Sequence, residues 1–210
     1  LRAVISTPDA MELTDIGANL AHESFAEDLE AVLARAEAAG VSRLIVTGSD
    51  LQSSRDALTL AERYPRQCFA TAGLHPHHVE DWSPAHDQLM RDSASARRLV
   101  AIGETGLDFF RDIAPRAAQE KVFEAQLAVA CDHGMPVFLH QRDAHDRFLP
   151  ILREHLPHLP RAVVHCFTDS GQALEDYLDV GCYIGITGWI CDERRGHHLR
   201  DLWATSPPID

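Results

Sequence analysis

Three side chains of types that bind metal ions each follow a short apolar run in the middle of the chain. They are Glu104, His140 and His165. If the three runs are neighbouring parallel strands, these side chains lie at the same end of a sheet and can converge on one point. A single histidine there could simply be hydrogen-bonded at a strand end. Three such residues in register predict a divalent metal site, and imidazole with carboxylate suits Zn or Mn, whereas an oxygen-rich shell suits Mg.

More polar residues flank this predicted metal site. His75 and His77 follow another apolar run, and Asp108 lies shortly after Glu104. We interpret His75 as a catalytic residue that contacts substrate or assists proton transfer, and His77 as a second substrate-binding candidate. A histidine-rich loop is also typical of solvated surface. Asp108 either orients a metal ligand through a hydrogen bond or caps the segment that follows, and the sequence does not favour one over the other.

Arginines in the same group of loops predict contact with a phosphate. Arg142 follows the run that ends at His140, and Arg194 and Arg195 lie near the C-terminus. Guanidinium groups bind phosphate oxygens in a bidentate manner, so we interpret all three as substrate-binding candidates. For the last two, surface pairing with the adjacent acidic residues is nearly as well supported.

Alternating strand-like and helix-like segments must position these side chains. Short β-branched or apolar runs predict strands near residues 13–16, 43–47, 69–73, 99–103, 136–139, 162–164 and 183–187. Amphipathic stretches follow them, and the clearest predicted helix ends near Gly134. Asp50 is expected to cap the second helix, and Ser24 with Glu27 is expected to form a capping box before the first.

Seven such units with short connections predict an α/β fold, a TIM-type (β/α)₈ barrel whose eighth strand is missing. A complete barrel typically needs about 250 residues. A doubly wound open sheet is the alternative, but no glycine-rich phosphate loop follows an early strand. We treat residues 1–10 as an N-terminal extension and residues 11–210 as a single domain that is incomplete at its C-terminus.

The composition limits the partners and the location. A formal net charge of −13 argues against broad coating of duplex DNA, because such binding depends on neutralising many phosphates. It does not exclude a nuclease in which bound cations and a few arginines meet phosphate locally. Five cysteines without a CxxC pair predict free thiols and therefore a cytoplasmic location. No apolar run approaches the roughly 20 residues that span a membrane.

Several segments together resemble the TatD family of metal-dependent deoxyribonucleases, within the amidohydrolase-like superfamily. They read TDIGANL, TAGLHPHH, VAIGETGLDF, MPVFLHQRDAH, VVHCFTDS and YIGITGWICDERRG. The resemblance implies that Glu104, His140 and His165 bind a divalent metal, Mg before Mn or Zn, and that His75 contacts the scissile phosphate. It also implies a 3′–5′ exonuclease acting on single-stranded DNA, with a role in DNA repair. A monomer is favoured.

Two departures from the family pattern modify these expectations. Many relatives carry His-x-His after the first strand, where this chain has Gly17-Ala18-Asn19, and the Asn19 amide could contact a hydrated ion. The family's aspartate of the eighth strand has no counterpart in the 210 residues, so we expect the chain as it stands to bind metal weakly and to cut poorly. The alternatives are an ester or amide hydrolase, such as an aminoacyl-ester deacylase, and a degenerate barrel that binds without turnover.

Overall fold

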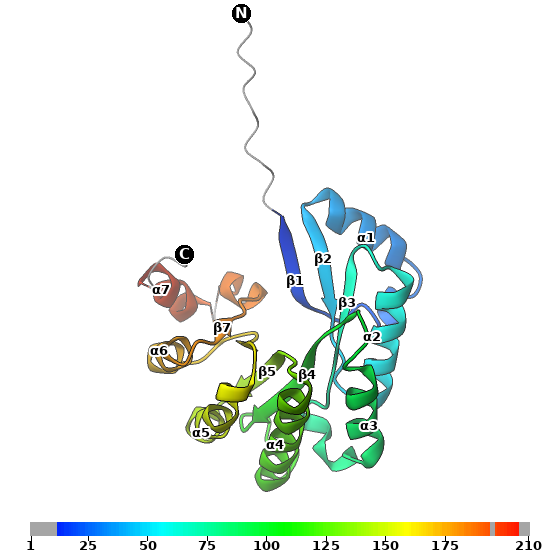
Figure 1. Ribbon diagram of the computed structural model, residues 1–210. Helices are drawn as coiled ribbons and strands as arrows, with labels where there is room; N and C mark the ends of the chain where they lie inside the picture. The colour runs from blue at the N-terminus through cyan, green and yellow to red at the C-terminus, as the bar shows by residue number, and fades with distance from the viewer. Residues whose placement is uncertain (1–11, 194–195, 206–210) are drawn as a thin grey trace, which may run out of the picture.

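The protein, described by a computed structural model over residues 12–193 and 196–205, contains a curled sheet flanked by helices (Figure 1). Seven parallel strands follow one another across the sheet in chain order. They are β1 (Leu13–Ala18), β2 (Val41–Val46), β3 (Cys68–Ala72), β4 (Leu99–Asp108), β5 (Val137–Arg142), β6 (Ala162–Val164) and β7 (Tyr183–Ile184). The predicted TIM-type arrangement of seven strand–helix units is confirmed. The predicted extension at residues 1–10 lies outside the described residues.

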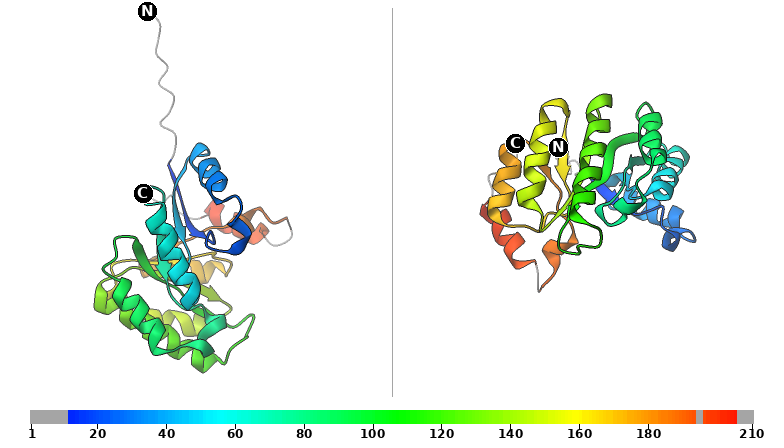
Figure 2. Two further views of the ribbon diagram at one scale, coloured as in Figure 1. Left: turned by 90° about the vertical axis from the view of Figure 1, so that its right-hand side faces the viewer. Right: turned by 90° about the horizontal axis from the view of Figure 1, so that it is seen from below.

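Helices lie outside the curled sheet, as the views of Figure 2 show. The α-helices are α1 (Leu29–Ala38), α2 (Leu51–Arg63), α3 (Pro84–Ser93), α4 (Arg116–His133), α5 (His145–His155), α6 (Gly171–Asp179) and α7 (His197–Thr205). Short 3₁₀ helices are η1 (Glu23–Phe25), η2 (Pro76–Asp81), η3 (Leu156–His158) and η4 (Gly188–Cys191). Within the described ranges, none of the helices has the length and apolar character that crossing a membrane requires.

Two helix starts show how local sequence sets the helix boundaries. Asp50 caps α2 as predicted. Its carboxylate accepts the backbone N–H of Ser53 at 2.8 Å, and the Ser53 hydroxyl accepts the backbone N–H of Asp50. The capping box predicted at Ser24 is wrong. The His22 ring accepts the Ser24 backbone N–H, which places Ser24 inside η1, and α1 begins later without a side-chain cap.

Strand β4 is longer than its apolar run predicted. It does not end at Gly103 but continues to Asp108, paired in parallel register with β5. Gly103 and Gly106 have φ values of 139° and 148°, and a Cβ at either position would collide with a backbone oxygen of β5. These glycines therefore permit the close approach that carries the strand past Glu104. Strand β7, in contrast, stops at Ile184, short of the predicted residue 187.

The core lies mainly between the middle strands of the sheet and the helices that cover them. The largest apolar cluster packs β3 to β6 against α4, α5 and α6, and a second cluster packs β1 to β3 against α1 and α2. In the described residues β1 and β7 are the two edges of the sheet. A cavity of about 500 Å³ lies between these edges, lined by residues 14–17 and 185–188 together with His165 and Cys166.

Candidate metal centre

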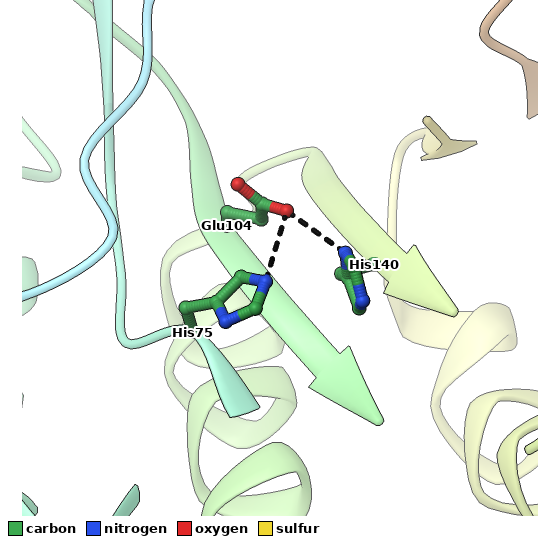
Figure 3. Close-up of side chains that lie close together, drawn as sticks. All are labelled: His75, Glu104 and His140. Carbon is green, nitrogen blue, oxygen red and sulfur yellow. Dashed lines mark hydrogen bonds and ion pairs between the residues drawn. The ribbon is translucent and has the colours of Figure 1, made fainter. Parts of the chain in front are cut away.

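One carboxylate oxygen, Oε1 of Glu104, is the meeting point of three imidazole rings. It lies 2.6 Å from Nε2 of His165, 3.0 Å from Nδ1 of His140 and 3.4 Å from Nε2 of His75. All four side chains are largely buried. Figure 3 shows His75 and His140 approaching Glu104 from two sides. The structure thus brings the three residues predicted to bind metal, and the predicted catalytic histidine, to one point.

Four neighbouring strands supply these residues. His75 caps the start of η2 shortly after β3, Glu104 lies within β4, His140 lies within β5 and His165 follows β6. Because the strands are parallel and adjacent, their carboxyl ends open onto the same end of the sheet. The ring of Phe138, which is also on β5, stacks on the His165 ring with centroids 4.5 Å apart.

Asp108 and His77 extend the cluster. Oδ2 of Asp108 accepts hydrogen bonds from Nε2 of His77 at 2.7 Å and from Nε2 of His140 at 3.3 Å. The same carboxylate accepts the backbone N–H of Arg111 at 2.8 Å. His140 therefore bridges two carboxylates, and Asp108 both orients this histidine and fixes the start of the next loop.

The electrostatics of the cluster favour a cation. Burial by itself would raise the pKa of Glu104, but hydrogen bonds from His140, His165 and His75 outweigh it and hold that pKa well below its ordinary value. Burial would lower the pKa of His140, yet its bonds to Asp108 and Glu104 raise it to about 9. In this form the imidazolium compensates the two buried carboxylates. A bound metal ion would provide the same positive charge in place of protons.

The donor atoms fit a divalent ion. One atom from each of His75, Glu104 and His140 lies within 4.8 Å of the other two, close enough to share an ion. This group differs from the predicted one in containing His75 rather than His165. Nδ1 of His75 accepts the backbone N–H of His77 at 3.2 Å, which assigns the ring proton to Nε2. In that tautomer Nε2 donates a hydrogen bond, and it would have to lose this proton to bind an ion.

Two buried glutamines of α4 hold the backbone beside the cluster. Oε1 of Gln126 accepts the backbone N–H of Leu74 at 2.7 Å, and its Nε2 donates to the Leu74 carbonyl at 3.0 Å. Gln119 binds the backbone N–H of Asp108 in the same way at 2.9 Å. Each glutamine therefore fixes the chain at, or next to, a residue of the site.

A cavity of about 630 Å³ opens onto the cluster. Its lining includes Glu104, His140, His165 and Arg142 and continues to His197 and His198 of α7. The predicted substrate-binding residue Arg142 thus lies at this cavity.

Other predicted site residues lie elsewhere. Asn19 is exposed just beyond β1, and the described contacts of Glu104 do not include it. Arg194 and Arg195 lie outside the described residues.

Comparison with known proteins agrees with this arrangement. The family model for TatD related DNase matches residues 14–209. The chain belongs to this family. A protein of Enterobacter lignolyticus named 3′-5′ ssDNA/RNA exonuclease TatD is 53% identical over 92% of this chain and 74% of its own length. The protein of the same name from Salmonella typhimurium is 50% identical with the same coverage.

Solved structures of TatD relatives have the same fold. The crystal structure of YJJV, a TatD homologue from Escherichia coli K12, matches with a TM-score of 0.84 at 34% identity, covering 92% of this chain and 74% of that one. A TatD family hydrolase from Entamoeba histolytica matches with a TM-score of 0.84 at 25% identity, covering 94% of this chain and 71% of that one.

Sequence reasoning missed some residues that shape this TatD-family site. Gln119 and Gln126 lie seven positions apart on α4, on the same buried face as apolar residues such as Phe123. Polar residues on an otherwise apolar helical stripe were a usable signal, because a buried amide must find hydrogen-bond partners. Phe110 also lines the cavity beside Arg142, and its position in a loop gave no such signal.

Proposed function

We propose that this protein is a divalent-metal-dependent 3′–5′ exonuclease acting on single-stranded DNA or RNA. The observation that carries the proposal is the convergence of three imidazoles on one oxygen of Glu104 at the mouth of a cavity. The names of relatives about 50% identical support the same activity and substrate class. A divalent ion at such a site supplies positive charge for phosphoryl oxygens and lowers the pKa of a water molecule.

The protein's own residues would then share the work as follows. Glu104, His140 and His165 hold the ion, in line with the sequence-based expectation. Nε2–H of His75 donates to a phosphate oxygen, which its assigned tautomer supports. Arg142 at the cavity wall offers a further cation to the strand. This local positive charge supports binding of a polyanion by a protein whose net charge is −13.

The identity of the ion and the biological setting belong to the same proposal. The family resemblance favours Mg, whereas a set of two imidazoles and one carboxylate favours Mn or Zn. A role in DNA repair, a monomeric state, a single domain and a cytoplasmic location remain predictions. All five cysteines are free in the structure, which supports a reducing compartment.

The test is a cleavage assay on single-stranded oligonucleotides labelled at the 3′ or the 5′ end. Each is incubated with Mg, Mn or Zn and with EDTA. We expect metal-dependent shortening from the 3′ end, and loss of about a thousandfold in rate for Glu104→Gln, which keeps the shape of the side chain and removes its charge. The exposed Glu154→Gln on α5 is the matched control and should cleave normally.

Three results of these assays would contradict the proposal in different ways. If the folded protein, at high concentration and saturated with each ion in turn, leaves all oligonucleotides intact even after long incubation, the exonuclease proposal is wrong. Hydrolysis of an aminoacyl ester by the same preparation would then favour the ester-hydrolase alternative. Cleavage that persists in Glu104→Gln would show that the activity does not come from this centre.

A further inference from the structure

The loop after β4 presents an aromatic ring to the cavity that opens onto Glu104. Phe110 is 56% exposed, a high value for such a large apolar side chain, and it lines the 630 Å³ cavity together with Glu104, His140 and His165. Fixed aromatic surface beside a phosphate-handling centre is the kind of surface on which nucleobases stack.

Arg142 and Asp108 hold this ring in place. The Arg142 guanidinium carbon lies 4.0 Å from the centroid of the Phe110 ring, so the cation stacks on one face of that ring. The Arg142 carbonyl accepts the backbone N–H of Phe109 at 2.9 Å, and Asp108 accepts that of Arg111 at 2.8 Å. The backbone is therefore anchored on both sides of Phe110, so little ordering remains to be done when a ligand binds.

A second apolar residue of the same loop shows what an unremarkable exposed side chain looks like. Ile113 is 58% exposed, as much as Phe110, but it is not among the residues that line the cavity. Single exposed apolar residues are normal on protein surfaces and need no function. The position of Phe110 over Arg142 and beside Glu104 separates it from that ordinary case.

We propose that Phe110, backed by Arg142, is the platform on which a nucleobase next to the reacting phosphate stacks. The proposal rests on the proposed function and adds the chemical class that this subsite takes. Stacking contributes binding free energy that does not depend on counterion release, which suits an acidic protein. Because every base has a π-face, the platform accepts a strand of any sequence, as an enzyme that shortens a strand one nucleotide at a time requires.

Two variants and one control test the platform. Affinity for a fluorescent single-stranded oligonucleotide is measured by anisotropy in EDTA, where cleavage does not interfere, and kcat/KM is measured with the supporting ion. Phe110→Ala should weaken binding about 5- to 100-fold, in line with the loss of one stacked base. Phe110→Trp should bind at least as well as the wild type, and Ile113→Ala should be unchanged. Circular dichroism checks that each variant is folded.

An oligonucleotide with abasic residues at its 3′ end separates stacking from a structural role. The affinity of the wild-type protein should be lower for this oligonucleotide than for the intact one, by about the factor that Phe110→Ala causes with the intact one. Combining the variant with the abasic oligonucleotide should lower the affinity little further. The platform is overturned if Phe110→Ala binds the intact oligonucleotide as tightly as Ile113→Ala does. It is overturned as well if Phe110→Ala lowers the affinity for the intact and the abasic oligonucleotide by the same factor. It is also overturned if wild-type protein binds no single strand at all. A protein that binds through Phe110 but never cleaves contradicts only the proposed function.

Discussion

The middle of the sheet, from β3 to β5, is held far more firmly than the edges formed by β1 and β7. In the middle, β4 runs for ten residues, and two buried glutamines of α4 bind its backbone and that of the segment after β3. At the edges, β7 has two residues, and Leu13, Tyr183 and Ile186 are exposed. The site draws on both regions. Glu104 belongs to the firm middle, whereas His165 borders the cavity between the two edges.

The difference indicates a division between the two regions in how firmly they hold the side chains of the site. A carboxylate that gathers three imidazoles must be held accurately, because small displacements of reacting groups are costly in rate. Loops and short elements such as β7 open locally at low free-energy cost, so side chains that border them are held less firmly. The following comparisons between the two regions test that division.

The largest contrast should come from two isoleucines. Ile102 of β4 is fully buried, whereas Ile186 beyond β7 is 44% exposed. Ile102→Ala should lower the free energy of unfolding by about 2–5 kcal/mol, because it leaves a cavity in a packed core. Ile186→Ala should change it by less than about 0.5 kcal/mol. Urea denaturation followed by circular dichroism measures both, and equal losses would contradict the proposed difference between the regions.

Two histidines on opposite sides of Glu104 should separate metal binding from catalysis. His165→Gln removes a predicted ligand on the open side, so affinity for Mn should fall about 10- to 100-fold. His75→Gln keeps an N–H donor on the firm side and should lower cleavage while leaving metal affinity nearly unchanged. Calorimetric titration with Mn and the oligonucleotide assay give the two readings. A comparable loss of affinity in His75→Gln would instead support the group of His75, Glu104 and His140 as the ligand set.

The glutamines offer a third comparison. Gln126→Leu leaves the buried backbone N–H and carbonyl of Leu74 without their side-chain partner. The free energy of unfolding should therefore fall by about 1–3 kcal/mol. Because Leu74 precedes His75, kcat should fall as well. Gln88→Leu on the exposed face of α3 removes only a surface bond to Asp92 and is the matched control. Chemical denaturation and initial rates give the two readings, and a normal kcat in Gln126→Leu would mean that this glutamine is not needed to position His75.

The smallest effect concerns the alkylation rates of two buried thiols that have the same raised pKa. Burial raises the pKa of both Cys68, in β3, and Cys182, just before β7, to about 11. At pH 8 their thiols stay protonated in the folded state, so alkylation should proceed through local opening and be faster at Cys182 by severalfold. Exposed Cys191 should react first. Mass spectrometry of iodoacetamide-treated protein measures the order, and faster labelling of Cys68 than of Cys182 would reverse the proposed ranking.

Much of the fold was predictable because strands that are buried on both faces have continuous apolar sequences. The run at residues 162–164 is β6 itself, and Asp50 caps α2 as its residue type suggests. The extension of β4 through Glu104 was not predictable from hydrophobicity. Its second half, GETGLD, holds two glycines, three polar residues and a single leucine, and it becomes a strand because β5 approaches closely enough to pair with it.

The candidate site was predictable to a similar depth. Residue type and a place directly after an apolar run were enough to bring Glu104, His140 and His165 together. Contacts between segments far apart in the chain were not visible in this way. The bond from His77 to Asp108 joins residues 31 positions apart, and the Gln126 bonds to Leu74 join residues 52 positions apart. Such pairs depend on how helices and loops pack, which a local pattern does not record.

The glycine contacts beneath the site bear on how the protein could be re-engineered. A Cβ on Gly73 would lie 2.6 Å from the backbone of Gly103, and a Cβ on Gly103 would meet the backbone of Phe138. The residue that follows β3 thus touches β4, and β4 touches β5, main chain to main chain, with no side chain that selection could enlarge or shrink. A mutational library intended to change substrate preference should leave this seam intact. Diversity belongs in the loop residues of the cavity wall, such as Phe110 and Thr168, where a new side chain meets substrate rather than another strand.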